Sequence, residues 1–252
     1  VAVDARGTGA TYPDSAFASE GAVYLDQVLP YMTVARRGQG NFAEAFPGEF
    51  RGVTAGGQEV RLDALGVIWT LVFSQAGALD LAEGVTATYR LGLDPEADPA
   101  PPQQATAWQL DPASGQWQAL GEAPLTDGVY TAEVTSLAPV CWATAVDDVC
   151  EVSGQVQDAG GQPIANASVV YRDLAGSFRT STLTDASGAF TLTVARHDSA
   201  VVTPYFGGVA GTGAALSTTA GCPVTVPDPL TVTLPDYRID LTWDRGYGDL
   251  DA

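Results

Sequence analysis

The chain has 252 residues and a formal net charge of −19, from 30 acidic and 11 basic residues, and every basic residue is Arg. Without Lys it has neither the lysine of a P-loop nor the amine of a Schiff-base enzyme. A single His excludes a two-His metal site, and the acidic surface disfavours a nucleic-acid backbone as partner. No apolar run approaches the roughly 18 residues of a membrane-spanning helix. The length predicts about two domains.

Short segments in which apolar and polar residues alternate predict strands through the first half of the chain. A loop with Pro112 early and Gly115 late lies between Trp108 and Trp117 and predicts a hairpin. No stretch of 11 or more residues keeps an apolar helical period without Gly or Pro, so we expect helix only as a turn or two. The strands predicted here are residues 22–28, 60–62, 67–73, 87–91, 105–110, 116–120 and 129–134.

A second series of strands follows the acidic pair Asp147 and Asp148, which we interpret as a domain boundary. Its predicted strands are residues 151–157, 168–172, 180–184, 189–194, 200–205, 230–234 and 238–243. The glycine-rich residues 207–213 predict a long loop or a linker. The sequence therefore predicts an all-β chain of two consecutive β-sandwich domains, 1–146 and 147–236, with 237–252 as a C-terminal strand or the start of a further module.

Turn residues and apolar positions recur at characteristic spacing at the start of the second series. They are Val152, Ser153, Gly154, Gln155, Val156, Asp158, Gly161, Pro163, Ile164, Ala167, Ser168, Val169, Thr184, Asp185, Gly188 and Phe190. This pattern resembles the carboxypeptidase regulatory-like domain, which we place at about residues 150–235. The resemblance implies a transthyretin-like β-sandwich without catalytic machinery, of the kind found in secreted peptidases, outer-membrane receptors and surface adhesins.

The first 146 residues carry a looser pattern of aromatic, glycine and strand positions. They are residues 46–50, Gly57, 60–62, Gly66, Gly77, 79–81, Gly84, Trp108, 114–117 and Tyr130. This pattern resembles the extracellular β-domain of cartilage intermediate layer protein and its bacterial relatives, which often precedes a regulatory-like domain. Residues 241–243 and 249–251 resemble the opening of a further secreted β-module. We therefore expect the chain to come from a longer protein.

Three cysteines leave at least one thiol unpaired within the chain. Cys150 precedes the first strand of the second domain and Cys222 precedes a late one. Such strand ends can be neighbours in a sandwich, so we expect a Cys150–Cys222 disulfide. A Cys141–Cys150 pairing and three reduced thiols are the alternatives, and a secreted setting favours oxidation.

Carboxylates cluster at the domain boundary, where Asp147, Asp148 and Glu151 lie close in sequence. Calcium prefers oxygen ligands, so these residues are the candidate site for a calcium ion that stiffens the joint between the domains. Solvated loop charge is the plainer interpretation, because no EF-hand spacing is present. We expect no other cofactor.

Aromatic residues are the candidates for a ligand face. The Trp residues are expected in the core, where each buries about 150–250 Å². Tyr205 and Phe206, beside the glycine-rich residues, are the better exposed candidates for stacking on a sugar. Cys141 and His197 lie in different predicted domains and have no third residue to orient the imidazole, so we expect no catalytic residues and no enzyme activity.

Taken together, these features predict a non-catalytic structural or adhesive module of a secreted or cell-surface bacterial protein. Its partners would be other protein subunits or surface glycans. Both chain ends are strand-like, and Ile239, Leu241 and Trp243 are candidates for exchange onto the open strand edge of a neighbouring subunit. The alternative is a carbohydrate-binding accessory module of a larger secreted enzyme.

Overall fold

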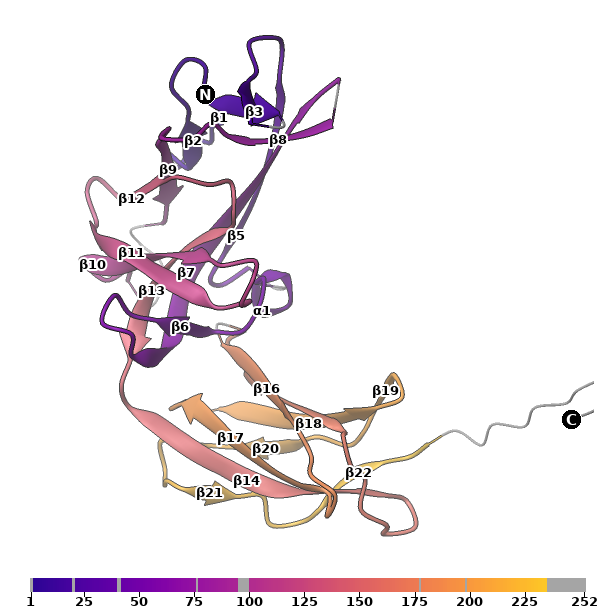
Figure 1. Ribbon diagram of the computed structural model, residues 1–252. Coiled ribbons are helices and arrows are strands. Elements are labelled where there is room, and N and C mark those ends of the chain that lie inside the picture. Colours follow the sequence, from indigo (N-terminus) through magenta and orange to yellow (C-terminus); the bar gives the residue numbers. More distant parts are fainter. Residues whose placement is uncertain are drawn as a thin grey trace, which may run out of the picture.

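The computed structural model describes residues 2–19, 21–39, 42–75, 77–94, 100–176, 178–197 and 199–234. These residues form strands with a single helical turn, α1 (Phe42–Ala45), so the all-β prediction is confirmed (Figure 1). Within these ranges, no helix is long and apolar enough to span a bilayer.

Five strands of residues 1–146, the predicted first domain, close into a ring. They are β6 (Arg51–Val53), β7 (Glu59–Ser74), β10 (Gln104–Leu110), β11 (Trp117–Pro124) and β13 (Val140–Val146). β7 pairs with β6 and β13, β10 joins β13 to β11, and β11 closes the ring by pairing with β6 in parallel. Trp108, Trp117 and Cys141 belong to the core on the ring's inner side and are buried.

β7 extends beyond the ring and pairs there with β5 (Leu29–Arg36) and β8 (Gly77–Leu81), next to β3 (Phe17–Ser19) and β4 (Ala22–Val23). A second sheet contains β1 (Ala2–Val3), β2 (Gly9–Thr11), β9 (Ala87–Gly92) and β12 (Val129–Val134). A second core lies between this sheet and β7, and includes Ile68, Tyr89, Tyr130 and Trp142.

An irregularity in β7 lets this strand serve both cores. Trp142 lies opposite Gly66 and Ala143 opposite Ala64, so Leu65 is an extra residue on the β7 side. An extra residue reverses which alternate side chains face each way. Accordingly Leu62, Ala64 and Val67 pack in the core of the ring, whereas Leu65, Ile68 and Val72 pack in the second core.

Gly66 explains why the sequence predicted two strands, 60–62 and 67–73, where the structure has one. Glycine inside a strand pattern usually marks an interruption. Here a Cβ at Gly66 would lie 2.7 Å from Leu91 Cδ2 and 3.1 Å from the backbone oxygen of Ala35. The glycine therefore permits close packing within a continuous strand.

The strands that follow Asp147 and Asp148, the predicted second domain, form a sandwich of two layers (Figure 1). One layer contains β14 (Val149–Asp158), β17 (Ala189–Ala195), β21 (Val224–Thr225) and β22 (Leu230–Val232). The other contains β15 (Ser168–Asp173), β16 (Arg179–Leu183), β18 (Ala200–Phe206), β19 (Val209–Ala210) and β20 (Ala214–Leu216). Alternate residues such as Val169, Tyr171, Leu192 and Val202 are buried between the layers.

Two local predictions were wrong. In place of the strand predicted at 22–28, the structure has the short β4 and, from Leu29 onward, β5. β5 contains Pro30, which an edge strand can accommodate. Residues 207–213 are not a linker: Gly207 and Gly208 have positive φ values of 58° and 80° and turn the chain directly from β18 into β19. At the N-terminus, β1 is already paired with β2 in its own domain.

All strand pairs formed by the described residues join strands on the same side of Asp147 and Asp148. β13 ends at Val146 and β14 begins at Val149, so these two acidic residues connect the two groups of strands.

Candidate functional site

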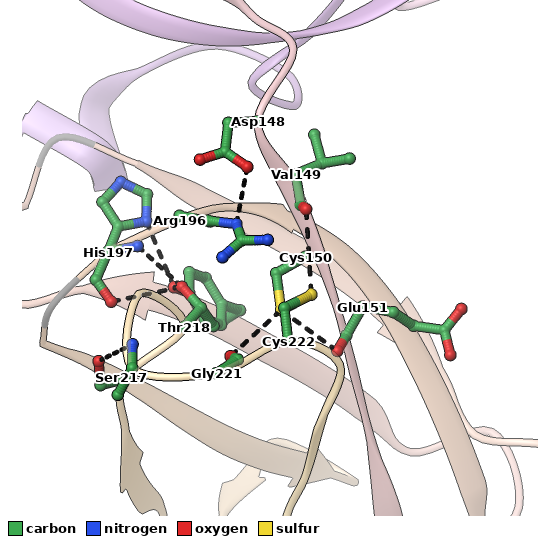
Figure 2. Close-up of a disulfide and its surroundings, with 12 residues drawn as sticks. Asp148, Val149, Cys150, Glu151, Arg196, His197, Ser217, Thr218, Gly221 and Cys222 are labelled. Carbon is green, nitrogen blue, oxygen red and sulfur yellow. Dashed lines mark hydrogen bonds and ion pairs between the residues drawn. A yellow bond between two sulfur atoms is a disulfide. The ribbon is translucent and has the colours of Figure 1, made fainter.

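The disulfide joins Cys150 and Cys222, whose Cα atoms are 5.6 Å apart (Figure 2). It is the pairing that the sequence favoured, and it connects the start of β14 to the segment just before β21. Cys141 is the free cysteine of the described chain and is buried in the ring. The disulfide therefore links the start of β14, which follows directly on the first domain, to a late segment of the second domain.

The three carboxylates predicted to bind calcium lie next to the disulfide in the sequence, at Asp147, Asp148 and Glu151. Asp148 Oδ1 lies 2.7 Å from Arg196 Nε. Figure 2 shows the carboxylates of Asp148 and Glu151 directed to different sides of the disulfide. Across the ranges that the structure covers, no three His, Cys, Asp or Glu side chains gather as a metal site. Calcium binding by Asp147, Asp148 and Glu151 stays a prediction, which equal melting temperatures in calcium and in chelator would contradict.

Aromatic side chains connect the two domains. Phe42 lies on α1, and Phe46 and Phe50 lie between α1 and β6. The ring centroids of Phe46 and Trp117 are 5.0 Å apart. Phe50 contacts Phe178 of the second domain with ring centroids 5.6 Å apart. Since both of these rings are only 1% exposed, one continuous core crosses the boundary between the domains.

The aromatic contacts continue into the second domain. The Phe178 ring lies 6.0 Å from Tyr171 and 5.3 Å from His197. His197 Nδ1 is 3.3 Å from the Tyr171 hydroxyl, and the His197 backbone N–H donates to Thr218 Oγ1. The His197 ring thus packs against Phe178 and is tied to Tyr171 and Thr218.

Polar contacts flank the aromatic ones. Arg172 Nη1 of β15 donates to Glu44 Oε1 of α1 at 2.6 Å, and Ser181 Oγ of β16 donates to Glu49 Oε1 at 2.9 Å. The hydrogen bond from Arg172 is the main cause that lowers the pKa of Glu44. Both pairs join the first domain to the outer face of the β15–β16 layer of the second.

A polar cavity of about 200 Å³ lies beside these contacts. Arg51 and Arg61 are direct neighbours on β6 and β7, and both line the cavity. Burial, followed by the nearby charge of Arg51, lowers the pKa of Arg61. Thr180, Thr182, Thr191 and Thr193 of the second domain form the opposite wall. The junction therefore has an apolar side and a hydroxyl-lined charged side.

The two ligand-face candidates have different surroundings. Tyr205 is 39% exposed, whereas Phe206 packs against the core, because successive strand residues point to opposite faces. Tyr205 lines a cavity of about 140 Å³ together with Arg172, Arg179 and Glu44. Tyr205 is thus the residue that presents an aromatic ring to solvent beside charged groups.

The remaining predicted residues are not brought together. Burial raises the pKa of the Cys141 thiol, which lies in the first domain, whereas His197 lies in the second. Ile239, Leu241 and Trp243 lie outside the described residues. The aromatic junction was not predicted, although the spacing of Phe42, Phe46 and Phe50 at intervals of four residues could have indicated a shared apolar face.

Several solved structures are similar to this chain. The shaft pilin SpaA from Lactobacillus rhamnosus GG is 10% identical, with a TM-score of 0.27 over 54% of this chain and 88% of that one. The minor pilin GBS52 of Streptococcus agalactiae is 12% identical, with a TM-score of 0.30 over 55% of this chain and 86% of that one. The pilus 2b backbone protein of group B streptococcus is 8% identical, with a TM-score of 0.28 over 59% and 93%. At these values the likeness carries no inference about function.

A search of curated proteins found no match. The resemblance of residues 1–146 to the β-domain of cartilage intermediate layer protein stays a prediction. Residues 151–234, about a third of the chain, match the family model described as the carboxypeptidase regulatory-like domain. This second segment of the chain is therefore a carboxypeptidase regulatory-like domain, as the sequence predicted.

Proposed function

We propose that the chain is a non-catalytic structural module of a secreted or cell-surface bacterial protein, in which the two domains act as one stiff unit. The observation that carries this proposal is the contact between Phe50 and Phe178 within a core that continues across the domain boundary. Independent domains joined by a short link usually meet through a smaller, more polar surface and move relative to each other. A buried aromatic junction opposes such motion.

The disulfide supports an extracellular setting. Disulfides persist in oxidising compartments and are rare in the cytosol. The Cys150–Cys222 bond lies beside the junction, where it ties the start of β14 to the segment before β21. It therefore cross-links the second domain close to the residues that connect it to the first.

Relaxation measurements by NMR test the stiff unit. We expect the amides of both domains to report one rotational correlation time in the native chain. Phe178→Ala removes the aromatic contact with Phe50 and should give two correlation times. Phe190→Ala, which truncates another buried ring of the second domain, should keep one. Independent tumbling in the native chain would contradict the proposal.

Antibody labelling of intact cells tests the location. We expect cells of the source organism to be labelled without permeabilisation. Labelling only after lysis would place the protein inside the cell and would contradict a surface role.

A carbohydrate-binding role is the second candidate, favoured by the exposed ring of Tyr205 beside Arg172, Arg179 and Glu44. An aromatic face next to hydrogen-bonding groups suits a sugar ring. A glycan array tests it: selective binding that is lost in Tyr205→Ala and kept in Leu183→Ala supports this role. Leu183 is an exposed control on β16 of the same sheet, with β15 between the two strands.

A further inference from the structure

An apolar patch is exposed on the ribbon that the paired strands β5 and β7 form beyond the ring. We call it the ribbon patch, and it comprises Leu29, Tyr31, Trp69, Leu71 and Phe73. Leu29, Tyr31 and Leu71 are 55%, 59% and 56% exposed. They are direct neighbours across the strands, because Tyr31 pairs with Leu71 and Leu29 with Phe73. Large exposed apolar side chains that adjoin one another usually mark an interaction surface.

The ribbon patch continues the face that forms the core of the ring. Val67 of β7 and Ala35 of β5, which are paired, are buried in that core. Two residues further along β7, Trp69 is only partly buried at the margin of this core. Another two residues along, Leu71 is exposed. The side chains of one strand face thus remain apolar beyond the point where the protein covers them.

The β5 side of the ribbon is also an open strand edge. Among the residues that the structure places, β5 pairs with β7 alone. Its inward-facing residues Met32 and Val34 are only partly buried at the margin of the second core. An added strand beside β5 would therefore find free backbone groups and apolar side chains on both faces.

The chain itself contains a segment with the matching pattern. In residues 237–243 every second residue is apolar: Tyr237, Ile239, Leu241 and Trp243. At about 3.3 Å per residue, these seven residues would span about 23 Å, close to the roughly 26 Å of the eight-residue β5. This segment, which we call the tail, follows β22 of the second domain, whereas the ribbon patch belongs to the first.

We propose that the tail of one copy docks as a strand on the open edge of β5 in a second copy, where its apolar side chains extend the ribbon patch beside Leu29 and Tyr31. This inference rests on the proposed structural role and names its partner. The donor segment leaves the second domain and the acceptor lies in the first, so each copy has one donor and one acceptor. Such a head-to-tail contact continues into rings or filaments.

Light scattering over a concentration series tests the proposal with the full chain. We expect the molar mass of the native chain to rise above the 26.0 kDa of one copy as its concentration increases. Tyr31→Asp with Leu71→Asp removes the acceptor, and Ile239→Asp with Trp243→Asp removes the donor, so each double variant should remain at the mass of one copy. Leu174→Asp, at a position 62% exposed in the second domain, is the matched control and should assemble like the native chain.

Mixing the two double variants provides the sharper measurement. The intact tail of the acceptor variant can dock only on the intact patch of the donor variant, so the mixture should give a one-to-one dimer and nothing larger. Circular dichroism checks that both variants keep the native fold. Assembly of either double variant alone, or a native chain that stays monomeric at every concentration, would overturn the docking proposal. The stiff structural role is judged separately, by whether both domains of the donor variant, which should stay at the mass of one copy, share one rotational correlation time.

Discussion

Phe50 and Phe178 come from different domains, yet their rings lie 5.6 Å apart and both are buried. Truncation of either ring should cost about 3–5 kcal/mol of unfolding free energy, since a cavity remains. In a double-mutant cycle of Phe50→Ala and Phe178→Ala we expect a coupling energy of about 0.5–1.5 kcal/mol, measured by chemical denaturation. A coupling energy of zero would show that the two rings act independently.

Removal of the disulfide should destabilise the second domain. Cys150 and Cys222 are 72 residues apart, and closing a loop of this size contributes about 4 kcal/mol in the chain-entropy model. The variant with both cysteines replaced by Ala should therefore melt at a lower temperature in calorimetry. A reductant should lower the melting temperature of the native chain and leave that of the variant unchanged; an equal effect on both would point to another cause.

The Glu44–Arg172 pair should make the junction weakly sensitive to acid. Hydrogen bonding by Arg172 holds the pKa of Glu44 below its ordinary value of 4.5. The pair therefore stabilises the folded chain fully above pH 4.5, and this contribution is lost as the pH falls through the lower pKa of the folded state. Because both side chains are about half exposed, we expect no more than about 1 kcal/mol.

Glu44→Gln should reduce this acid dependence in urea titrations at several pH values, and added salt should reduce it too. Glu59→Gln is the matched control, because Glu59 pairs with Arg51 inside the first domain at 3.2 Å. An identical pH profile for Glu44→Gln and the native chain would contradict a role for this pair.

Gly66→Ala should destabilise the first domain by about 1–3 kcal/mol, because the new methyl group overpacks the space between Leu91 and the backbone of Ala35. Gly56→Ala is the control: a Cβ there would meet only Thr54 Oγ1, at 3.8 Å, and should change little. Denaturant midpoints of the two variants give the comparison, and equal midpoints would show that β7 can shift to accept the methyl group.

The sequence predicted the class of fold well because strand alternation and turn residues are local signals. The strands of the second domain lie close to their predicted ranges, and Thr184, Asp185 and Gly188 form the turn before β17. The strand predicted at 22–28 ends before β5 begins, because Pro30 disfavours a strand, although an edge strand can accommodate it. β7 was divided at Gly66 because a close approach by Leu91 has no local signature.

The candidate site was harder to predict, since it depends on contacts between distant residues. Arg172 and Glu44 are separated by 128 positions, and Phe50 and Phe178 by as many. The disulfide could be favoured from the sequence only because both cysteines flank strands of one domain. The ribbon patch follows from the extra residue at Leu65, which decides the side of the strand on which Leu71 emerges.

The closed ring buries the free thiol of Cys141, so the chemical reactivity of this thiol reports how often the ring opens. An alkylating reagent can reach this sulfur only while the surrounding strands are parted. The rate at which the reagent consumes the thiol would therefore count openings of the ring, without any label introduced from outside. A mechanical force that parts the strands of the ring would therefore increase the rate of alkylation at the Cys141 sulfur.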